Sequence, residues 1–248
     1  MKKVLFVFWH GLGDNILATP AIKRYKEVTG NYIGWAMLKR FEKTEIFKHN
    51  PYIDQLHYTL DAWNDFSSYK RGQKAVINEA IKIAKEFGYD EVIPITHAAR
   101  GVHKIIRTAN EIGVELTDMH TEFYGIDKYT YQELPYKDFI FFHGKAGVEA
   151  KNLPLEYITE YYMPKYNIDL PIMSPDFSWE VSEQPIHLAA SVMSKAKYIF
   201  VTDSVMYHIA HALGLRVDLA YFMRGSEVYN VVHPLHKCDE KVVYSLDK

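Results

Sequence analysis

The sequence is poor in the features that mark several classes of protein. Its one cysteine, Cys238, cannot form a disulfide within the chain, which is typical of proteins in a reducing compartment. The net charge of −2 lacks the basic excess of nucleic-acid-binding proteins. The apolar run from about Lys3 to Trp9 is too short to span a membrane, and glycines rather than a cleavage pattern follow it. We therefore expect a cytoplasmic protein without a nucleic-acid partner, although peripheral contact with a membrane is compatible with this composition.

Apolar and aromatic side chains, in contrast, are plentiful. Of the 248 residues, 48% are hydrophobic and 15% are aromatic, which is ample for a packed core and excludes a disordered chain. Strand patterns alternate with helix patterns in both halves, and this alternation predicts an α/β protein with parallel sheets. Residues 129–136 have no period and contain Pro135, so they are the candidate linker. The predicted domains are residues 1–134 and residues 135–248.

Most segments have a clear period. Thr19-Pro20 interrupts the first helical pattern, so the helix after the first strand is expected to begin later than Asn15. Residues 61–71 are polar and aromatic without a period, and we expect a loop there. The apolar spacing predicts helices over residues 41–48, 72–87, 102–112, 154–162 and 186–195, and strands over residues 4–8, 32–38, 55–59, 91–95, 139–142, 168–172, 216–222 and 242–244.

The first strand is followed by a glycine-bearing turn, Gly11-Leu12-Gly13-Asp14-Asn15. A dinucleotide-binding fingerprint would need a third glycine where this chain has Ile16, so a nicotinamide-dependent dehydrogenase is disfavoured. The glycines still allow a ligand to approach the backbone closely. Two interpretations of Asp14 stay open. It caps the following helix, or it acts as a general base that removes a proton from an attacking hydroxyl.

A second polar turn, Asp203-Ser204, follows an apolar strand pattern over residues 197–202. Helical spacing follows the turn, and Gly214 stands where a helix-ending glycine would. Ser204 is a suitable N-cap, and the helix start behind it would attract an anion such as a phosphate. The alternative is a purely structural turn beside a buried His208.

Two lysines and four histidines of the second half are candidates for binding a phosphate or a metal ion. Lys145 and Lys151 flank a glycine-containing loop, where they either neutralise a diphosphate or lie solvated on the surface. The histidines form pairs at a spacing of three residues, but no cysteine or carboxylate completes a zinc pattern, so no metal site is expected. The pairs are His208 with His211 and His233 with His236.

Three stretches of the chain, in their order, carry a similarity to a known family. The first is Gly13-Asp14-Asn15-Ile16-Leu17-Ala18-Thr19-Pro20-Ala21-Ile22, the second joins residues 141–146 to residues 151–157, and the third covers residues 196–214. Together they resemble the heptosyltransferase-like glycosyltransferases of family 9, and a weaker likeness covers residues 89–113. The resemblance implies the α/β GT-B fold, with two Rossmann-like domains whose parallel sheets face a central cleft.

The resemblance also implies a reaction and its site. The reaction is an inverting transfer from a nucleotide-sugar donor, often ADP-heptose, to a hydroxyl of a glycan or glycolipid acceptor, with no metal and no cofactor. Asp14 matches the family's proposed base. On the donor side we expect Gly13, His143, Gly144, Lys145, Lys151, Asp203, Ser204 and His208. On the acceptor side we expect His10, Asn15, His97 and Arg100.

Three places in the sequence depart from the family pattern. Gly144 stands where the family has a proline, Val205 replaces the signature glycine, and Asn152-Leu153 replaces an arginine-tryptophan pair. The loss of the arginine removes a cation. A valine in place of the glycine leaves less room for a phosphate to approach the backbone. The alternative function is therefore a non-catalytic nucleotide-binding or partner-binding module built on the same fold.

Overall fold

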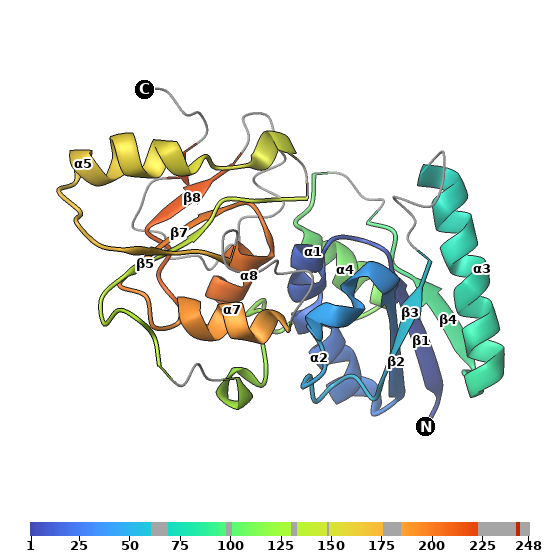
Figure 1. Cartoon of the computed structure of the whole chain (residues 1–248). Coiled ribbons are helices and arrows are strands. Elements are labelled where there is room, and N and C mark those ends of the chain that lie inside the picture. The colour runs from blue at the N-terminus through green and yellow to red at the C-terminus, as the bar shows by residue number, and fades with distance from the viewer. Residues whose placement is uncertain are drawn as a thin grey trace. The chain divides into compact units, whose positions relative to one another are not determined.

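The computed structural model describes residues 1–60, 69–97, 101–129, 133–147, 149–175, 185–222 and 242–243. The chain divides into two compact units, Met1–Tyr124 and Gly125–Lys248. Each unit contains its own parallel sheet with helices beside it (Figure 1). The predicted α/β class with two parallel sheets is therefore confirmed. The division falls ten positions before the boundary that the linker pattern predicts at residues 134 and 135.

The first unit is built around one buried strand. Residues 4–8 of this strand, β1, are all 0% exposed, as expected of a strand that is covered on both faces. The sheet has four strands in the order β3-β2-β1-β4, and every neighbouring pair is parallel. Its strands are β1 (Lys3–Phe8), β2 (Tyr32–Leu38), β3 (Gln55–Thr59) and β4 (Glu91–Pro94).

Among the described residues of this unit, four α-helices accompany the sheet. The longest packs on β1, β3 and β4, whereas two others pack against each other on the opposite face (Figure 1). Pro20 lies in the first turn of the second helix, where its missing N–H is tolerated, and a separate helix precedes it from Leu12. The helix that contains Pro20 thus begins after Asn15, as predicted, whereas the short helix from Leu12 was not predicted. The helices are α1 (Leu12–Leu17), α2 (Thr19–Thr29), α3 (Tyr69–Phe87) and α4 (Lys104–Ile112).

Two predicted segments of this unit differ from the structure. The helix predicted over residues 41–48 is a 3-10 helix, Lys39–Thr44, because Glu45 adopts a left-handed conformation (φ 51°) that ends it. The loop predicted over residues 61–71 is helical from Tyr69 onward. The rest of that segment, residues 61–68, lies outside the described residues.

The second unit has a five-stranded parallel sheet in the order β6-β5-β7-β8-β9. In its core, side chains of the central strands pack against one helical segment. The ring of Tyr162 lies edge-on to the ring of Phe200, with 5.1 Å between the ring centroids. The strand predicted over residues 168–172 is wrong in extent, because only two residues pair with β5. The strands are β5 (Ile140–His143), β6 (Ile172–Met173), β7 (Tyr198–Thr202), β8 (Leu219–Tyr221) and β9 (Val242–Val243).

The helices in the described part of the second unit are short. A π-helical segment, Tyr157–Tyr162, leads into α5, so the helical path continues past Pro164, where the sequence predicts its end. Gly214 ends the last helix with φ 66°, as its position in the sequence predicts. The helices are α5 (Met163–Lys165), α7 (Ile186–Met193) and α8 (Val205–Ala212), and 3-10 turns cover Ile126–Lys128 and Glu149–Lys151.

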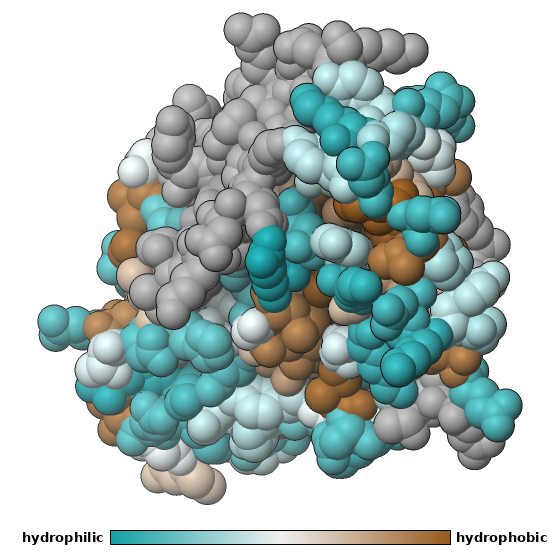
Figure 2. All heavy atoms as spheres, turned by 90° about the vertical axis from the view of Figure 1, so that its left-hand side faces the viewer, coloured by the Kyte–Doolittle hydropathy of each residue, from teal (hydrophilic) through white to brown (hydrophobic). Residues whose placement is uncertain are grey.

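Hydrophilic residues cover much of the described surface in the view of Figure 2, with smaller hydrophobic areas between them. Among the described helices, none is both long enough and apolar enough to cross a membrane.

Candidate functional site

Polar turns leave the carboxyl ends of parallel strands in both units. In the first unit, the turns after β1 and β4 lie at the same edge of the sheet because these strands are parallel neighbours. In the second unit the same holds for the turns after β5 and β7. Ligand sites of open α/β sheets form at this edge, so each unit has one candidate cluster of site residues.

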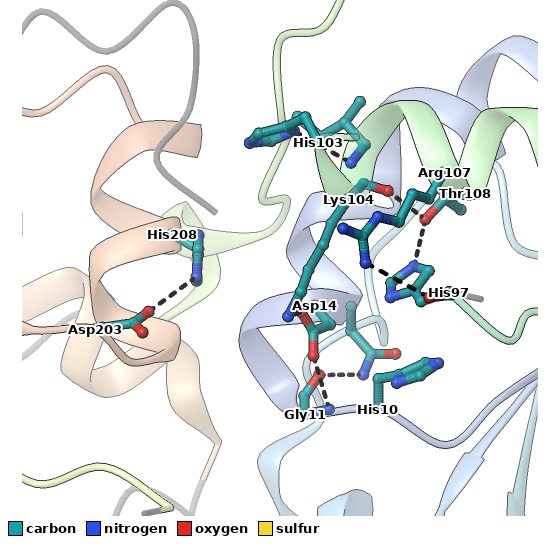
Figure 3. A network of polar contacts seen from close by, with 12 residues as sticks. His10, Gly11, Asp14, His97, His103, Lys104, Arg107, Thr108, Asp203 and His208 are labelled. Atoms are coloured by element: carbon teal, nitrogen blue, oxygen red, sulfur yellow. Dashed lines mark hydrogen bonds and ion pairs between the residues drawn. The ribbon is translucent and has the colours of Figure 1, made fainter. Parts of the chain in front are cut away.

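Asp14 is the centre of the first cluster. Its carboxylate belongs to the first turn of α1 and accepts a hydrogen bond from the Gly11 N–H at 3.2 Å. The Nζ atom of Lys104, at the start of α4, lies 2.5 Å from its other carboxylate oxygen (Figure 3). Asp14 thus supports the start of its helix and forms an ion pair at the same time. Its side chain is 16% exposed to solvent.

The electrostatic surroundings keep Asp14 ionised. Burial by itself would raise the pKa of the carboxyl group, but the ammonium of Lys104 outweighs this effect, and His10 and His97 act in the same direction. The pKa of Asp14 is held well below its usual range. A carboxylate in this state is ready to accept a proton, but only weakly basic while the ammonium stays in contact.

Two neutral histidines lie beside Asp14. The rings of His10 and His97 stack with 4.3 Å between their centroids and 17° between their planes. Burial lowers the pKa of His10, and burial together with the neighbouring His10 lowers the pKa of His97 to about 3. Both rings are therefore uncharged at neutral pH. His10 Nε2 donates to the carbonyl of Ile95 at 3.1 Å.

The hydrogen bonds of Thr108 fix which nitrogen of His97 carries the proton. The Thr108 hydroxyl lies 2.9 Å from the Lys104 carbonyl, which can only accept, so the hydroxyl hydrogen goes there. His97 Nε2, also 2.9 Å from this hydroxyl, must then donate to it. The other nitrogen, Nδ1, keeps its lone pair and has no hydrogen-bond partner among the described residues. His97 consequently offers one unused acceptor in a backbone conformation with φ 52°.

The other site residues predicted for the first unit are Asn15, Gly13 and Arg100. Asn15 is 0% exposed, and its carboxamide donates to the Gly11 carbonyl at 2.9 Å and accepts from the Trp35 indole at 3.0 Å. These bonds hold the turn after β1 and leave no surface of Asn15 for an acceptor in this conformation. Gly13 lies within the first turn of α1. Arg100 lies outside the described residues.

The second cluster centres on Asp203, the residue after β7. Its buried carboxylate forms an ion pair with Lys151 Nζ at 2.6 Å. The hydroxyl of Thr202 donates to the Lys151 carbonyl, so backbone and side chain of this lysine are both tied to the end of β7. His208 Nε2 lies 4.0 Å from the other Asp203 oxygen (Figure 3). The negative charge of Asp203 is thus balanced within its own unit.

Ser204 occupies the N-cap position of α8, as predicted, but its side chain does not cap the helix. Its hydroxyl instead makes a 2.9 Å hydrogen bond with Nδ1 of His143, the last residue of β5. The expected capping role of the hydroxyl is therefore wrong. The bond joins the exit turns of two neighbouring strands, so His143 and Ser204 do come together at one edge of the sheet.

The loop after β5 explains two of the departures from the family pattern. A side chain at Gly144 would place its Cβ 2.3 Å from the Leu153 carbonyl oxygen and 2.5 Å from the Phe142 ring, so only glycine fits. The Asn152 carboxamide accepts from the Ala146 N–H at 2.8 Å and closes the loop. Lys145 is exposed on this loop and forms no hydrogen bond or ion pair with any residue that the structure describes.

Lys104 and Thr108 were not found from the sequence. The helix pattern over residues 102–112 included both, but it did not show that this helix faces Asp14. One local signal in the sequence indicated an acidic partner for Lys104. Lys104 is the first residue of its helix, where the helix dipole makes a cation unfavourable unless an acid compensates its charge.

Within the described residues, no group of three or more His, Cys, Asp or Glu side chains is placed to hold a metal ion.

Comparisons with known proteins show the fold of this chain. No protein-family model and no curated protein matches the sequence. Solved structures that match nearly the whole chain include a family 9 glycosyl transferase of Veillonella parvula, heptosyltransferase WaaC of E. coli with ADP-2-deoxy-2-fluoro heptose, and ADP-heptose lps heptosyltransferase II of E. coli. Their identities are 14%, 14% and 12%, and their TM-scores are 0.65, 0.65 and 0.67.

The overlap is extensive on both sides. In the same order, the matches cover 99%, 97% and 98% of this chain and 86%, 92% and 90% of the other chains. The likeness to family 9 glycosyltransferases is thus confirmed at the level of the fold, which is that of the GT-B enzymes.

Proposed function

We propose that this chain is a glycosyltransferase of the cytoplasm that moves a sugar from a nucleotide-sugar donor to a hydroxyl group of a glycan or glycolipid. The single observation that carries the proposal is the ionised, partly buried carboxylate of Asp14 at the exit of β1. It occurs in a fold shared with heptosyltransferases, one of which was solved with ADP-2-deoxy-2-fluoro heptose. A nucleotide-sugar donor, with ADP-heptose as the first to test, follows from this combination.

In the proposed reaction, the acceptor oxygen attacks the anomeric carbon of the donor sugar. The bond from that carbon to the diphosphate breaks, the hydroxyl proton passes to Asp14, and one displacement inverts the anomeric centre. The contact with Lys104 keeps Asp14 deprotonated until an acceptor arrives. Withdrawal of the ammonium would then raise the basicity of the carboxylate when it is needed.

The neighbouring histidines fit the acceptor side of this reaction. His97 Nδ1 is a buried hydrogen-bond acceptor close to Asp14 without a partner among the described residues, so it can orient a sugar hydroxyl once a shift of the ring exposes it, and it does not compete for the proton. His10 supports the His97 ring by stacking on it.

The donor diphosphate is assigned to the second unit. Lys145, Lys151 and the start of α8 supply positive charge that stabilises the departing diphosphate, so the proposal includes neither a metal nor a cofactor. Lys145 is the more available cation, because Lys151 already balances Asp203. His143, Gly144, Ser204 and His208 line the same strand exits and complete the proposed donor side.

The proposal is tested by offering nucleotide sugars to the pure protein. A donor that binds only the folded chain raises its free energy of unfolding by about 2.7 kcal/mol at a hundredfold excess over Kd, which a thermal-shift screen detects. Release of nucleoside diphosphate in the presence of acceptor extracts then reports transfer. Asp14→Asn should lower turnover by about 10²–10⁴-fold and leave donor binding intact. Donor binding by the native protein without turnover under any acceptor would reject the enzyme and favour a non-catalytic binding module.

A further inference from the structure

The long helix α3 presents two different faces to its surroundings. Its inner face packs on β1, β3 and β4 (Figure 1). Gly72, Val76, Ala80 and Ala84 recur at every fourth position of this face and are buried. The outer face consists of exposed residues, here called the α3 cationic face: Lys70, Arg71, Lys74, Asn78, Ile81, Lys82, Lys85 and, at its edge, Glu86.

The α3 cationic face has an excess of positive charge. It carries five cationic side chains and one exposed acid, Glu86, at its edge. The other acid of the helix, Glu79, is only partly exposed and accepts a hydrogen bond from the Leu60 N–H at 2.6 Å. The helix therefore has a net charge of +3, whereas the whole chain has −2. Such an imbalance indicates an anionic partner for this face.

We propose that the α3 cationic face binds a membrane surface that contains anionic phospholipids. The helix has 19 residues and is about 28 Å long, and its cations spread over roughly a third of its circumference along that length, so a planar surface can approach several of them together. Ile81, 40% exposed, lies among the cations and supplies an apolar contact with the lipid interface.

A bilayer explains this face better than a nucleic acid does. The exposed apolar side chain of Ile81 has no partner on a phosphate backbone, whereas it can enter the apolar edge of a lipid interface. The position of the helix agrees with a membrane-bound acceptor. Because α3 follows β3 and leads into β4, its first turn lies toward the sheet edge that carries Asp14. The inference extends the proposed function to a lipid-linked acceptor, but its test requires no transfer activity.

The test is co-sedimentation of the full chain with vesicles at low salt. One set of vesicles is pure phosphatidylcholine, and the other contains about a third phosphatidylglycerol. We expect binding to the second set only, and loss of this binding as the salt concentration rises toward about 0.5 M. The double variant Lys74→Gln/Lys85→Gln should weaken the binding at least about tenfold. Ile81→Ser should weaken it less and leave the dependence on anionic lipid unchanged.

A charge-matched control separates the face from net charge. Lys165→Gln/Lys195→Gln removes two exposed lysines from the second unit and should bind vesicles as the native chain does. Thermal unfolding of all variants checks that they fold. The proposal would be overturned if the native chain did not bind anionic vesicles or bound both vesicle sets equally. It would also be overturned if the two double variants lost equal amounts of vesicle binding. Binding to single-stranded RNA without binding to vesicles would also overturn it, whatever the outcome of the donor screen.

Discussion

Lys104 Nζ lies 2.5 Å from Asp14 Oδ1, so the start of one helix holds the carboxylate at the start of another. The two residues are 90 positions apart and meet because β1 and β4 are parallel neighbours. The ion pair has opposite effects on a general base. It guarantees that Asp14 is deprotonated, and it lowers the affinity of the carboxylate for the proton that the reaction must remove.

The first prediction follows from this conflict. In Lys104→Gln the pKa of Asp14 should rise, because burial is then opposed only by the two histidines and the Gly11 N–H. A carboxyl group with a raised pKa is protonated at higher pH, so the acid limb of kcat/KM against pH should move upward. Lys23→Gln is the matched control, since Lys23 forms a 2.7 Å ion pair with Glu122 in the same unit. An acid limb that shifts equally in both variants, or in neither, would contradict the assigned role of Lys104.

The second prediction concerns the proton on His97. Thr108→Val keeps the shape of a side chain that is 0% exposed, but removes the oxygen to which His97 Nε2 donates. We expect a loss of about 1–3 kcal/mol in the free energy of unfolding, because a buried N–H is left without an acceptor. Nitrogen NMR of the imidazole should also show that the Nε2–H form no longer predominates.

Thr44→Val provides the comparison for this variant. Thr44 is also 0% exposed, and its hydroxyl donates to the Phe41 carbonyl at 2.6 Å, but no histidine depends on it. It should lose stability without any change in the imidazole spectrum. A native His97 spectrum in Thr108→Val would show that the tautomer is set by something else.

The sequence predicts those parts of the fold that depend on local pattern. The apolar run of β1 and the helix-ending Gly214 both result from rules that act within a few residues, and the structure agrees with them. The extent of β6 was missed, because a strand of two residues leaves almost no periodicity to read. The 3-10 helix Lys39–Thr44 was missed because the apolar spacing does not reveal the left-handed Glu45 that ends it.

The partners within each candidate site depend on contacts across the sheet. Asp14 and Asp203 were predicted as turn residues, but their lysine partners lie 90 and 52 positions away. Ser204 has the composition of an N-cap, yet His143, 61 positions earlier, takes its hydroxyl. Such choices follow from the order of strands in each sheet, which local pattern does not specify.

The third prediction tests how strongly Lys151 and Asp203 depend on each other. Lys151→Gln should lower the free energy of unfolding by about 1–3 kcal/mol, because it leaves the Asp203 carboxylate, only 6% exposed, without its cation. Adding Asp203→Asn should recover part of this loss, since the remaining buried group is then neutral. Denaturant unfolding of the two single variants and the double variant gives their interaction energy. Strictly additive losses would mean that the ion pair contributes nothing beyond its separate residues.

The last prediction concerns the loop after β5, where Gly144 passes between the Leu153 carbonyl and the Phe142 ring. In Gly144→Ala the added methyl group would meet a backbone oxygen at 2.3 Å, and the backbone cannot yield as a flexible side chain would. We expect a loss of at least about 2 kcal/mol in the free energy of unfolding, together with weaker donor binding, because the loop that carries Lys145 must shift. Gly147→Ala in the same loop meets no atom within 4 Å and should leave the midpoint of unfolding nearly unchanged. Equal stability of the two variants would show that the loop can open at Gly144 without strain, and that its closed form is not required for the donor side.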